Sequence, residues 1–336
     1  MTESLFARLL IFRSKGIGAI KYHELIKDFG GPEGAVRALA VSGDLIDSVR
    51  NEIDMAMRLG VKYITDDMPE FPAHYKSLRG HSPILSVRGD IKTLSKKTVG
   101  IVGTRHASAA GIKFTTELAT EFAKHGFAVV SGMAMGTDTA AHKGALNAES
   151  DAATIAVLAG GVDYIWPLEN ERLYHQIIER GAIVSDMPVG YVPVANNFIA
   201  RNRIVAGLSE RLILGEADAK SGSVATAEMA LEAEVPLWAI PSHPSDERSV
   251  GPNRFIKDGR AKLVSGIFDF FGVARGEKSP SKKTESDLLN FIGAVPVSES
   301  VLTSLAKKNI QEVTSELIRL ELLDLVKKTE GGFVRV

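Results

Sequence analysis

Short apolar runs alternate with helical stretches over residues 95–270, and this alternation constrains the fold more than any other feature of the chain. The runs are TVGIVG, FAVVSG, TIAVLAGG, AIVSD, RLILGEA and PLWAIPS. They are rich in valine, isoleucine and alanine and do not alternate strictly with polar residues, as is typical of strands covered on both faces. Strands that alternate with helices form a doubly wound, mostly parallel sheet. We therefore predict an α/β fold.

The regions on either side of this segment differ from it in composition and in the spacing of their apolar residues. The N-terminal part carries apolar residues at helical spacing and ends near the proline-bearing stretch DDMPEFPAHYKSLRGHSPIL. A polar, basic stretch, GVARGEKSPSKKTES, separates the sheet segment from the last part of the chain. The predicted domains are residues 1–75, 76–270 and 285–336, with a linker at 271–284.

Charge and cysteine content limit the classes of function. The chain of 336 residues has 40 Lys and Arg against 41 Asp and Glu, a net charge of -1, so a nucleic-acid surface must be a local patch. It has no cysteine, which excludes disulfides and thiolate sites and is consistent with a reducing cytoplasm. Arg8 and Arg13 interrupt the first apolar run, and no run approaches the length of a membrane span. We expect a cytoplasmic protein that does not contact membranes.

Most of the predicted strands end in small residues with arginines close by. Ligands of open α/β sheets bind beyond the carboxyl ends of the strands. Small residues let backbone N–H groups approach phosphate oxygens, and a following helix N-terminus adds a favourable dipole. This edge therefore predicts an anion site. Its candidate residues are Gly103, Thr104 and Arg105 after the first run, Ser131 and Gly132 after the second, and Lys220, Ser221, Gly222 and Ser223 after the fifth.

Each of these features has a structural interpretation as well. A glycine turn can be a tight strand-to-helix connection, and Arg105 can form a surface ion pair. Arg201 and Arg203, in the segment FIARNRIVAGLS before the fifth run, can pair with acids of the sheet. Asp138 can cap a helix, and His142 is expected to be a structural hydrogen-bonding residue rather than a catalyst.

Several patterns of nucleotide enzymes are missing. The chain has no P-loop, and the first turn spaces its glycines as Gly100, Gly103 and Gly111 rather than as G-x-G-x-x-G. The second run ends without the acid that would hold a ribose, and no G-x-S-x-G elbow is present. No cluster of His, Asp and Glu has convincing metal spacing. We therefore expect no cofactor, no metal and no catalytic residue.

Five blocks of sequence resemble, in order, the DNA processing protein A family, also called DprA or Smf. They are VGIVGTRHASAAG, VVSGMAMGTDTAAHKGAL, TIAVLAGGVDYIWPLENERL, the stretch from FIARNRIVAG to PLWAIPS, and GPNRFIKDGRAKLV, and they span residues 70–265. The resemblance implies an extended Rossmann-like fold without catalysis. It also implies a homodimer that binds and protects single-stranded DNA and loads the RecA recombinase onto it, in natural transformation and homologous recombination.

The resemblance also implies roles for individual residues. Arg105 is expected to bind a phosphate, and Phe198 to stack on a base. Ser221, Gly222 and Ser223 would offer backbone and hydroxyl donors to phosphate. Such a basic groove with an aromatic platform holds single strands without reading their sequence. The residues expected to line the same pocket as Phe198 are Arg201, Asn202 and Arg203.

The two flanking regions resemble small DNA-associated modules. Gly16 and Gly18 lie in a turn like that of a helix-hairpin-helix or sterile-alpha-motif-like unit, although a plain helical-hairpin turn explains them equally well. The last region reads as three helices and a hairpin, which is a winged helix. Its third predicted helix has three glutamates against Arg319, and this charge would be repelled by a DNA groove. We expect that domain to contact protein.

Two other functions remain open from the residues. The first is a nucleotide-processing enzyme of the lysine-decarboxylase-like phosphoribohydrolase superfamily, for which Glu228 is the one candidate, although the P-G-G-x-G-T-x-x-E pattern is absent. The second is a protein whose flanking domains alone bind DNA. That possibility conflicts with the concentration of arginine and glycine at the sheet edge.

Overall fold

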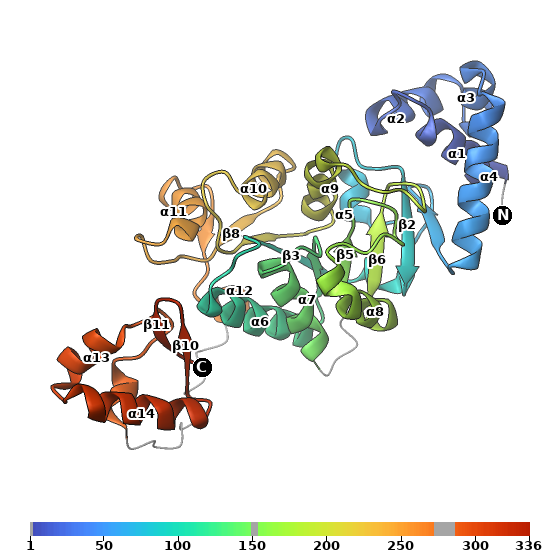
Figure 1. Cartoon of the computed structure of the whole chain (residues 1–336). Helices are drawn as coiled ribbons and strands as arrows, with labels where there is room; N and C mark the ends of the chain where they lie inside the picture. Colours follow the sequence, from blue (N-terminus) through green and yellow to red (C-terminus); the bar gives the residue numbers. More distant parts are fainter. Residues whose placement is uncertain (1–2, 149–153, 272–285) are drawn as a thin grey trace. The chain divides into compact units, whose positions relative to one another are not determined.

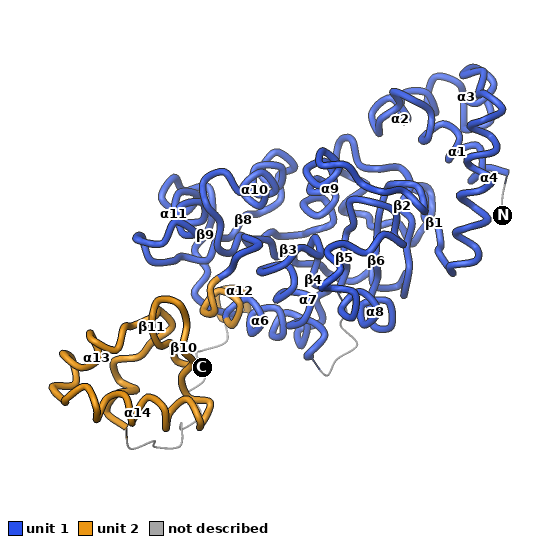
Figure 2. The backbone as a smooth tube through the Cα atoms, in the orientation of Figure 1, with its two compact units in different colours: residues 1–107, 114–267 blue, residues 108–113, 268–336 orange. Residues whose placement is uncertain are grey.

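The structure is a computed structural model that describes residues 3–148, 154–271 and 286–336. It divides into two compact units, which Figure 2 distinguishes by colour. Residues 272–284 of the predicted linker lie outside the described residues. The first unit comprises residues 1–107 and 114–267, and the second comprises residues 108–113 and 268–336.

A nine-stranded sheet forms the centre of the first unit (Figure 1). The strand order is β1-β2-β6-β5-β4-β3-β7-β8-β9, and all neighbours from β6 to β9 are parallel, whereas β2 is antiparallel to both β1 and β6. The prediction of a doubly wound, mostly parallel α/β sheet is confirmed. The strands are β1 (Lys62–Thr65), β2 (Ile84–Gly89), β3 (Thr98–Val102), β4 (Ala128–Ser131), β5 (Thr154–Val157), β6 (Ala182–Ser185), β7 (Leu212–Leu214), β8 (Leu237–Ala239) and β9 (Lys262–Leu263).

The central strands are buried along their whole length. Every residue of β3, β4, β5, β6 and β7 is buried. Such strands carry apolar side chains on both faces, since helices cover each face of the sheet. This is why the six runs read as nearly continuous apolar segments.

Helices pack on the two faces of this sheet. Figure 1 shows α6, α7 and α8 on one face and α9 and α10 on the other. The crossover order places the end of each parallel strand and the start of the following helix at one edge. The helices and 3-10 turns of this part are α5 (Ala73–Ser77), η1 (Ile91–Ser95), α6 (Ala109–Lys124), α7 (Thr137–Asn147), η2 (Leu168–Asn170), α8 (Glu171–Arg180), α9 (Ala195–Gly207), α10 (Gly222–Glu232), η3 (Glu247–Ser249) and α11 (Val250–Lys257).

The N-terminal helices pack beside the antiparallel end of the sheet. Arg13 connects them to it, because its Nε donates to Glu52 Oε2 at 2.9 Å and its Nη1 donates to the backbone oxygen of Asp186 at 2.8 Å. Residues 62–65 lie inside the region predicted to be helical but form β1, because the sequence KYIT suits a strand and pairs with β2. The helices are α1 (Glu3–Arg13), α2 (Ala19–Asp28), α3 (Pro32–Leu39) and α4 (Gly43–Arg58).

The second unit has its own apolar core, formed by residues such as Leu302, Leu317 and Phe333. Its first predicted helix is only the 3-10 turn η4, since Gly293 and Pro296 follow closely and disfavour a longer helix. The winged-helix interpretation of this unit stays a prediction. Its elements are α12 (Phe268–Phe271), η4 (Asp287–Asn290), α13 (Glu299–Ala306), α14 (Ile310–Leu322), β10 (Val326–Thr329) and β11 (Gly332–Arg335).

The acidic residues of α14 have local partners. Glu312 forms a capping box with Asn309, whose Oδ1 accepts from the Glu312 backbone N–H at 2.9 Å. Glu316 pairs with Lys308 at 2.9 Å. In the part of the chain that the structure describes, no helix combines the length and apolar character needed to cross a membrane.

Candidate nucleic-acid interface

A cavity of about 290 Å³ opens at the carboxyl ends of β3 and β4, beside α9 and the N-terminus of α10. This is the edge at which ligands of open α/β sheets bind. Ten of the thirteen predicted site residues line it, although they come from four separate segments. These ten residues are Gly103, Thr104, Arg105, Gly132, Phe198, Arg201, Asn202, Ser221, Gly222 and Ser223.

The turn after β3 is held on both sides by backbone hydrogen bonds. Thr104 donates its N–H to the Glu216 backbone oxygen at 2.6 Å, and its own carbonyl accepts from Thr137 N at 3.1 Å. Gly103 allows this close approach, since a Cβ there would lie 2.8 Å from Thr137 Cβ. The turn is therefore fixed, while the Arg105 side chain that it carries is exposed.

Arg105 lies beside two aromatic rings. Its guanidinium carbon is 5.0 Å from the centroid of the Trp166 ring, a cation–π contact. Trp166 in turn meets Phe198 with ring centroids 4.6 Å apart and an interplanar angle of 62°. Both rings are only half-buried. The structure thus places a cation and an aromatic surface side by side, with Phe198 lining both the cavity and the small pocket that Trp166 borders.

Trp166 was missed by the reasoning from sequence. It lies in the segment YIWPLENERL, after β5. In this region the sequence analysis used only the predicted strand and the glycines that follow it. A tryptophan that follows a strand at the ligand-binding edge is itself a signal, because large aromatic side chains are costly to expose without a function.

Arg201 is buried and donates hydrogen bonds to backbone carbonyl groups of the site. It is 8% exposed, and its Nη1 donates to the Gly132 oxygen at 2.6 Å and also to the Val157 oxygen. Burial lowers the pKa of Arg201 to about 10, with the charge of Arg105 acting in the same direction. The side chain therefore remains charged at neutral pH and raises the positive potential of the cavity while it holds two strand ends.

Asp138 is the acidic partner of this arrangement. Its Oδ2 accepts from the backbone N–H groups of Gly132 at 3.1 Å and Ala134 at 3.3 Å. Burial raises its pKa, and Arg201 opposes that shift. A Cβ at Gly132 would come within 2.8 Å of both Arg201 Nη2 and Asp138 Oδ2, so any other residue would displace one of these two side chains. Asp138 is thus explained as a residue that organises the turn after β4.

The N-terminus of α10 supplies the other wall of the cavity. Ser221 caps the helix, because its Oγ accepts from the Ser223 backbone N–H at 3.3 Å. Asn202 bridges from α9, donating to the Gly222 oxygen at 3.3 Å. The positive end of an eleven-residue helix therefore faces the same cavity as Arg105.

Three predicted residues do not line this cavity. The Ser131 side chain is buried and donates to the Ile101 oxygen at 2.7 Å. Lys220 is exposed near the end of the loop that leads from β7 to α10. Arg203 was expected to share the pocket with Arg201, but two residues along a helix turn the side chain by about 200°. It pairs with Asp186 at 2.5 Å instead and borders a different cavity.

Of the residues weighed for catalysis, Asp138 lines the cavity, whereas Glu228 and His142 lie outside it. Glu228, the candidate of the enzyme hypothesis, is on α10 and pairs with Arg260. His142 is buried, and its Nδ1 lies 2.6 Å from Thr154 Oγ1. Because Thr154 donates to the Val129 oxygen, Nδ1 is the donor in this pair. This agrees with the structural role expected for His142.

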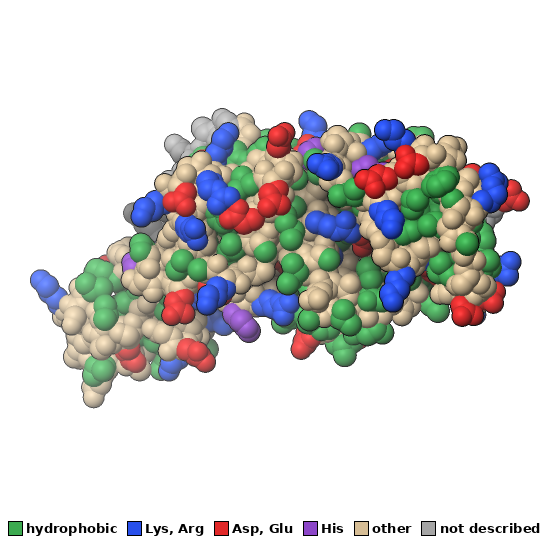
Figure 3. All heavy atoms as spheres, turned by 90° about the horizontal axis from the view of Figure 1, so that it is seen from above, with side chains coloured by type: hydrophobic (Ala, Val, Ile, Leu, Met, Phe, Trp, Pro, Cys, Tyr) green, Lys and Arg blue, Asp and Glu red, His purple; other side chains and the backbone are tan. Residues whose placement is uncertain are grey.

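Charge on the surface is mixed rather than uniformly basic. Figure 3 shows lysine and arginine side chains interspersed with acidic ones on the face that it presents. An anion would therefore be attracted locally, by Arg105, Arg201 and the helix N-terminus, as the balanced net charge predicts. Apart from this cavity, three side chains with metal-ligating atoms, His23, Asp66 and His81, meet near the N-terminal helices. The sequence search missed them because they are far apart in the chain.

The chain is similar to known proteins over most of its length. A family model described as DNA recombination-mediator protein A matches residues 62–274. Protein Smf of Synechocystis is 30% identical over 315 residues, which cover 80% of this chain and 79% of that protein. DNA processing protein DprA of Bacillus subtilis is 35% identical over 213 residues, which cover 63% of this chain and 71% of that protein.

Two solved structures are similar to a large part of this chain. DprA from Streptococcus pneumoniae has a TM-score of 0.68 at 26% identity and covers 81% of this chain and 98% of its own. DNA processing protein A from Helicobacter pylori has a TM-score of 0.57 at 32% identity and covers 63% of this chain and 94% of its own. The structure of the Helicobacter protein concerns its mode of binding single-stranded DNA.

Proposed function

The chain belongs to the DNA recombination-mediator protein A family, and from this premise we propose that its cavity binds the phosphate backbone of single-stranded DNA. The protein would protect the strand and load the RecA recombinase onto it. Natural transformation and homologous recombination are the processes that such loading serves in this family. A homodimer is part of the same proposal.

The observation that carries the proposal is the convergence of three features at one edge of the sheet, around the cavity and the small pocket beside it that Trp166 lines. Arg105 supplies an exposed cation, and the N-terminus of α10 supplies backbone dipoles. The half-buried rings of Trp166 and Phe198 supply a surface on which a base can stack. Single strands are bound by this combination, since every base has a π-face and every nucleotide a phosphate.

The relatives support the same ligand. The Helicobacter pylori protein, to which this chain is 32% identical, binds single-stranded DNA. The cavity also lacks the chemistry of a dinucleotide site, because the turn after β3 presents an arginine where G-x-G-x-x-G would present a second glycine. A phosphate within a DNA strand is therefore favoured over the pyrophosphate of a cofactor.

Binding of labelled oligo-dT and of a matched duplex, measured by fluorescence anisotropy across a salt series, tests the proposal. Arg105→Ala is expected to weaken binding of the single strand and to lower the salt slope by about one. Lys124→Ala is the matched control, because it also removes one charge. Lys124 ends α6, so it lies at the opposite edge of the sheet, and its affinity is expected to equal that of the wild type.

Three outcomes would contradict this assignment. Equal binding by wild type and Arg105→Ala would move the DNA site to the flanking domains. Tighter binding of the duplex than of oligo-dT would contradict single-strand preference. Absence of binding at moderate salt, together with hydrolysis of a nucleoside monophosphate, would favour the enzyme hypothesis.

Loading of RecA needs a separate measurement. RecA filament formation on DNA coated with single-strand-binding protein can be followed through DNA-dependent ATP hydrolysis. Wild-type protein is expected to shorten the lag, and Arg105→Ala to do so less. If DNA binding is intact but the lag does not change, the mediator part of the proposal fails on its own.

A further inference from the structure

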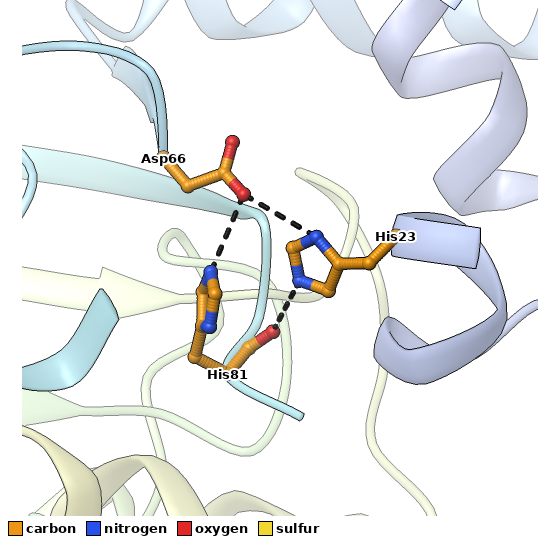
Figure 4. Close-up of side chains that lie close together, drawn as sticks. All are labelled: His23, Asp66 and His81. Carbon is orange, nitrogen blue, oxygen red and sulfur yellow. Dashed lines mark hydrogen bonds and ion pairs between the residues drawn. The ribbon is translucent and has the colours of Figure 1, made fainter. Parts of the chain in front are cut away.

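His23, Asp66 and His81 bring three ligating atoms together at the junction of the N-terminal helices and the sheet (Figure 4). His23 lies on α2, Asp66 directly follows β1, and His81 precedes β2. His23 Nδ1 is 3.5 Å and His81 Nε2 is 3.3 Å from the same oxygen, Asp66 Oδ2. All three atoms lie within 4.8 Å of one another.

The other nitrogen of each imidazole fixes its tautomer. His23 Nε2 lies 3.3 Å from the His81 carbonyl oxygen, and His81 Nδ1 lies 3.0 Å from the Leu78 carbonyl oxygen. Because a carbonyl can only accept, these two nitrogens carry the protons. In neutral rings, His23 Nδ1 and His81 Nε2 are then acceptors that face a third acceptor, the Asp66 carboxylate.

Three converging acceptors need a cation or protons between them. The distances of both imidazole nitrogens to Asp66 Oδ2, 3.5 and 3.3 Å, suit a metal ion, since ligands placed tetrahedrally about 2.0–2.2 Å from Zn²⁺ are about 3.3–3.6 Å apart. Histidines that bind metals also characteristically donate their second N–H to a backbone carbonyl, as both rings do here.

The remaining carboxylate oxygen has its own partner. Arg8 Nη1 lies 3.5 Å from Asp66 Oδ1, and Arg8 Nη2 lies 2.9 Å from Asp67 Oδ2. Two carboxylates therefore share one guanidinium, which leaves a net negative charge beside the two imidazoles. Arg8 orients Asp66 so that Oδ2 faces the histidines, and the local charge favours a divalent cation.

We propose that His23, Asp66 and His81 form a site for a divalent transition metal of the Zn²⁺ class, with a water molecule as fourth ligand. Imidazole and carboxylate are suitable ligands for Zn²⁺. The ion links α2 to the segments that flank β1 and β2, so it fastens the N-terminal helices to the sheet. This site is separate from the DNA cavity and does not depend on the proposed function.

Calorimetric titration of ZnCl₂ into the full-length, tag-free, chelator-treated protein tests this site. One ion per chain is expected to bind with micromolar or tighter affinity and to raise the midpoint of thermal unfolding, because a ligand that binds only the folded state stabilises it. His23→Gln and His81→Gln are each expected to weaken binding by at least about tenfold. His175→Gln, which changes an exposed histidine of α8, is the control and is expected to bind like the wild type.

Unfolding curves recorded in chelator show whether each variant is folded before metal is added. If a variant is not folded, the wild-type protein still decides the question. X-ray absorption at the zinc edge is then expected to show two imidazole nitrogens and two oxygens around the ion. No zinc binding by the wild type, equal binding by the double variant His23→Gln/His81→Gln, or an absorption spectrum with one imidazole or none would each overturn the proposal.

Discussion

The guanidinium of Arg105 lies over the ring of Trp166, with 5.0 Å between the guanidinium carbon and the ring centroid. The edge-to-face contact of Trp166 with Phe198 extends this arrangement to α9. A phosphate bound by Arg105 would therefore lie near an aromatic surface. The Arg105 side chain and the two aromatic rings also restrict one another's motion. Less conformational entropy is therefore lost when DNA binds.

Trp166→Ala is expected to weaken binding of single-stranded DNA. Removing one aromatic stacking surface costs about 1–3 kcal/mol, which corresponds to a loss of affinity of about 5- to 150-fold. Because the change removes a side chain and leaves every charge in place, the salt slope should stay that of the wild type, in contrast to Arg105→Ala. Anisotropy with oligo-dT measures both quantities.

Fluorescence provides the control for this prediction, since the chain has only two tryptophans. Trp238 is on β8 and contacts Lys262, away from the cavity residues. In Trp238→Phe the remaining Trp166 should be quenched by oligo-dT, whereas Trp166→Phe should show little quenching. Quenching confined to Trp238 would place the strand elsewhere on the protein.

Arg201→Met is expected to destabilise the fold rather than only to weaken DNA binding. The change removes donors to the Gly132 and Val157 carbonyls and leaves the buried Asp138 without its counter-charge. Breaking a buried charge pair in this way costs about 3–5 kcal/mol. The free energy of unfolding in guanidinium chloride measures the loss, with Arg105→Ala as the exposed arginine for comparison. A stable Arg201→Met that has lost only DNA affinity would show that Arg201 contacts phosphate directly.

The sheet was predictable because strands that are buried on both faces have mostly apolar sequences. The runs that became β3 to β8 are mostly apolar, and their alternation with helices predicts parallel strands, although it does not give the strand order. β1 was not predicted, since KYIT is four residues long and follows directly on helical sequence. Such a short strand exists only through pairing with β2, and that partner lies across a stretch rich in prolines.

The site was predictable as a set of segments but not as a set of contacts. The rule that strand ends share one edge brought Arg105, Gly132 and Ser221 together correctly. It could not separate Arg201 from Arg203, because that depends on how α9 is rotated against the sheet. Nor could it show that Arg201 turns inward to the backbone, which is decided by the unpaired carbonyls at the ends of neighbouring strands.

Gly136→Ala is expected to displace the turn that carries Arg105. Gly136 has φ of 73°, and a Cβ there would lie 2.6 Å from the Arg105 carbonyl oxygen and also against that of Thr104. Gly126→Ala is a matched control, since Gly126 has φ of 82° but no atom within 4 Å of its Cβ position. An alanine in left-handed backbone costs about 1–2 kcal/mol, and the cost is higher at Gly136, whose ψ of -120° lies outside the left-handed helical region. Only Gly136→Ala should lose more stability than that and also bind oligo-dT more weakly; equal effects on both measurements would mean that the turn adapts.

His142 makes folding stability depend on pH. Burial lowers its pKa to about 3, whereas the unfolded chain has the ordinary value near 6.5. Between these two values the unfolded state binds the proton and the folded state does not, so the free energy of unfolding falls as pH falls. The stability that the neutral imidazole contributes is fully present above about pH 6.5 and is lost progressively below it, by at most about 1.4 kcal/mol per pH unit.

His142→Asn is expected to remove this contribution, because an amide does not titrate and can still donate to Thr154 Oγ1. The variant will be less stable at pH 7.5, since it leaves space in the core. Its unfolding free energy should nevertheless fall less steeply than that of the wild type between pH 6.5 and pH 5. Urea denaturation at several pH values measures both slopes, and above pH 5 most carboxylates contribute little to the difference. Parallel slopes for the two proteins would mean that His142 is protonated in the folded state, and its buried Nε2 would then need an acceptor that is absent among the described residues.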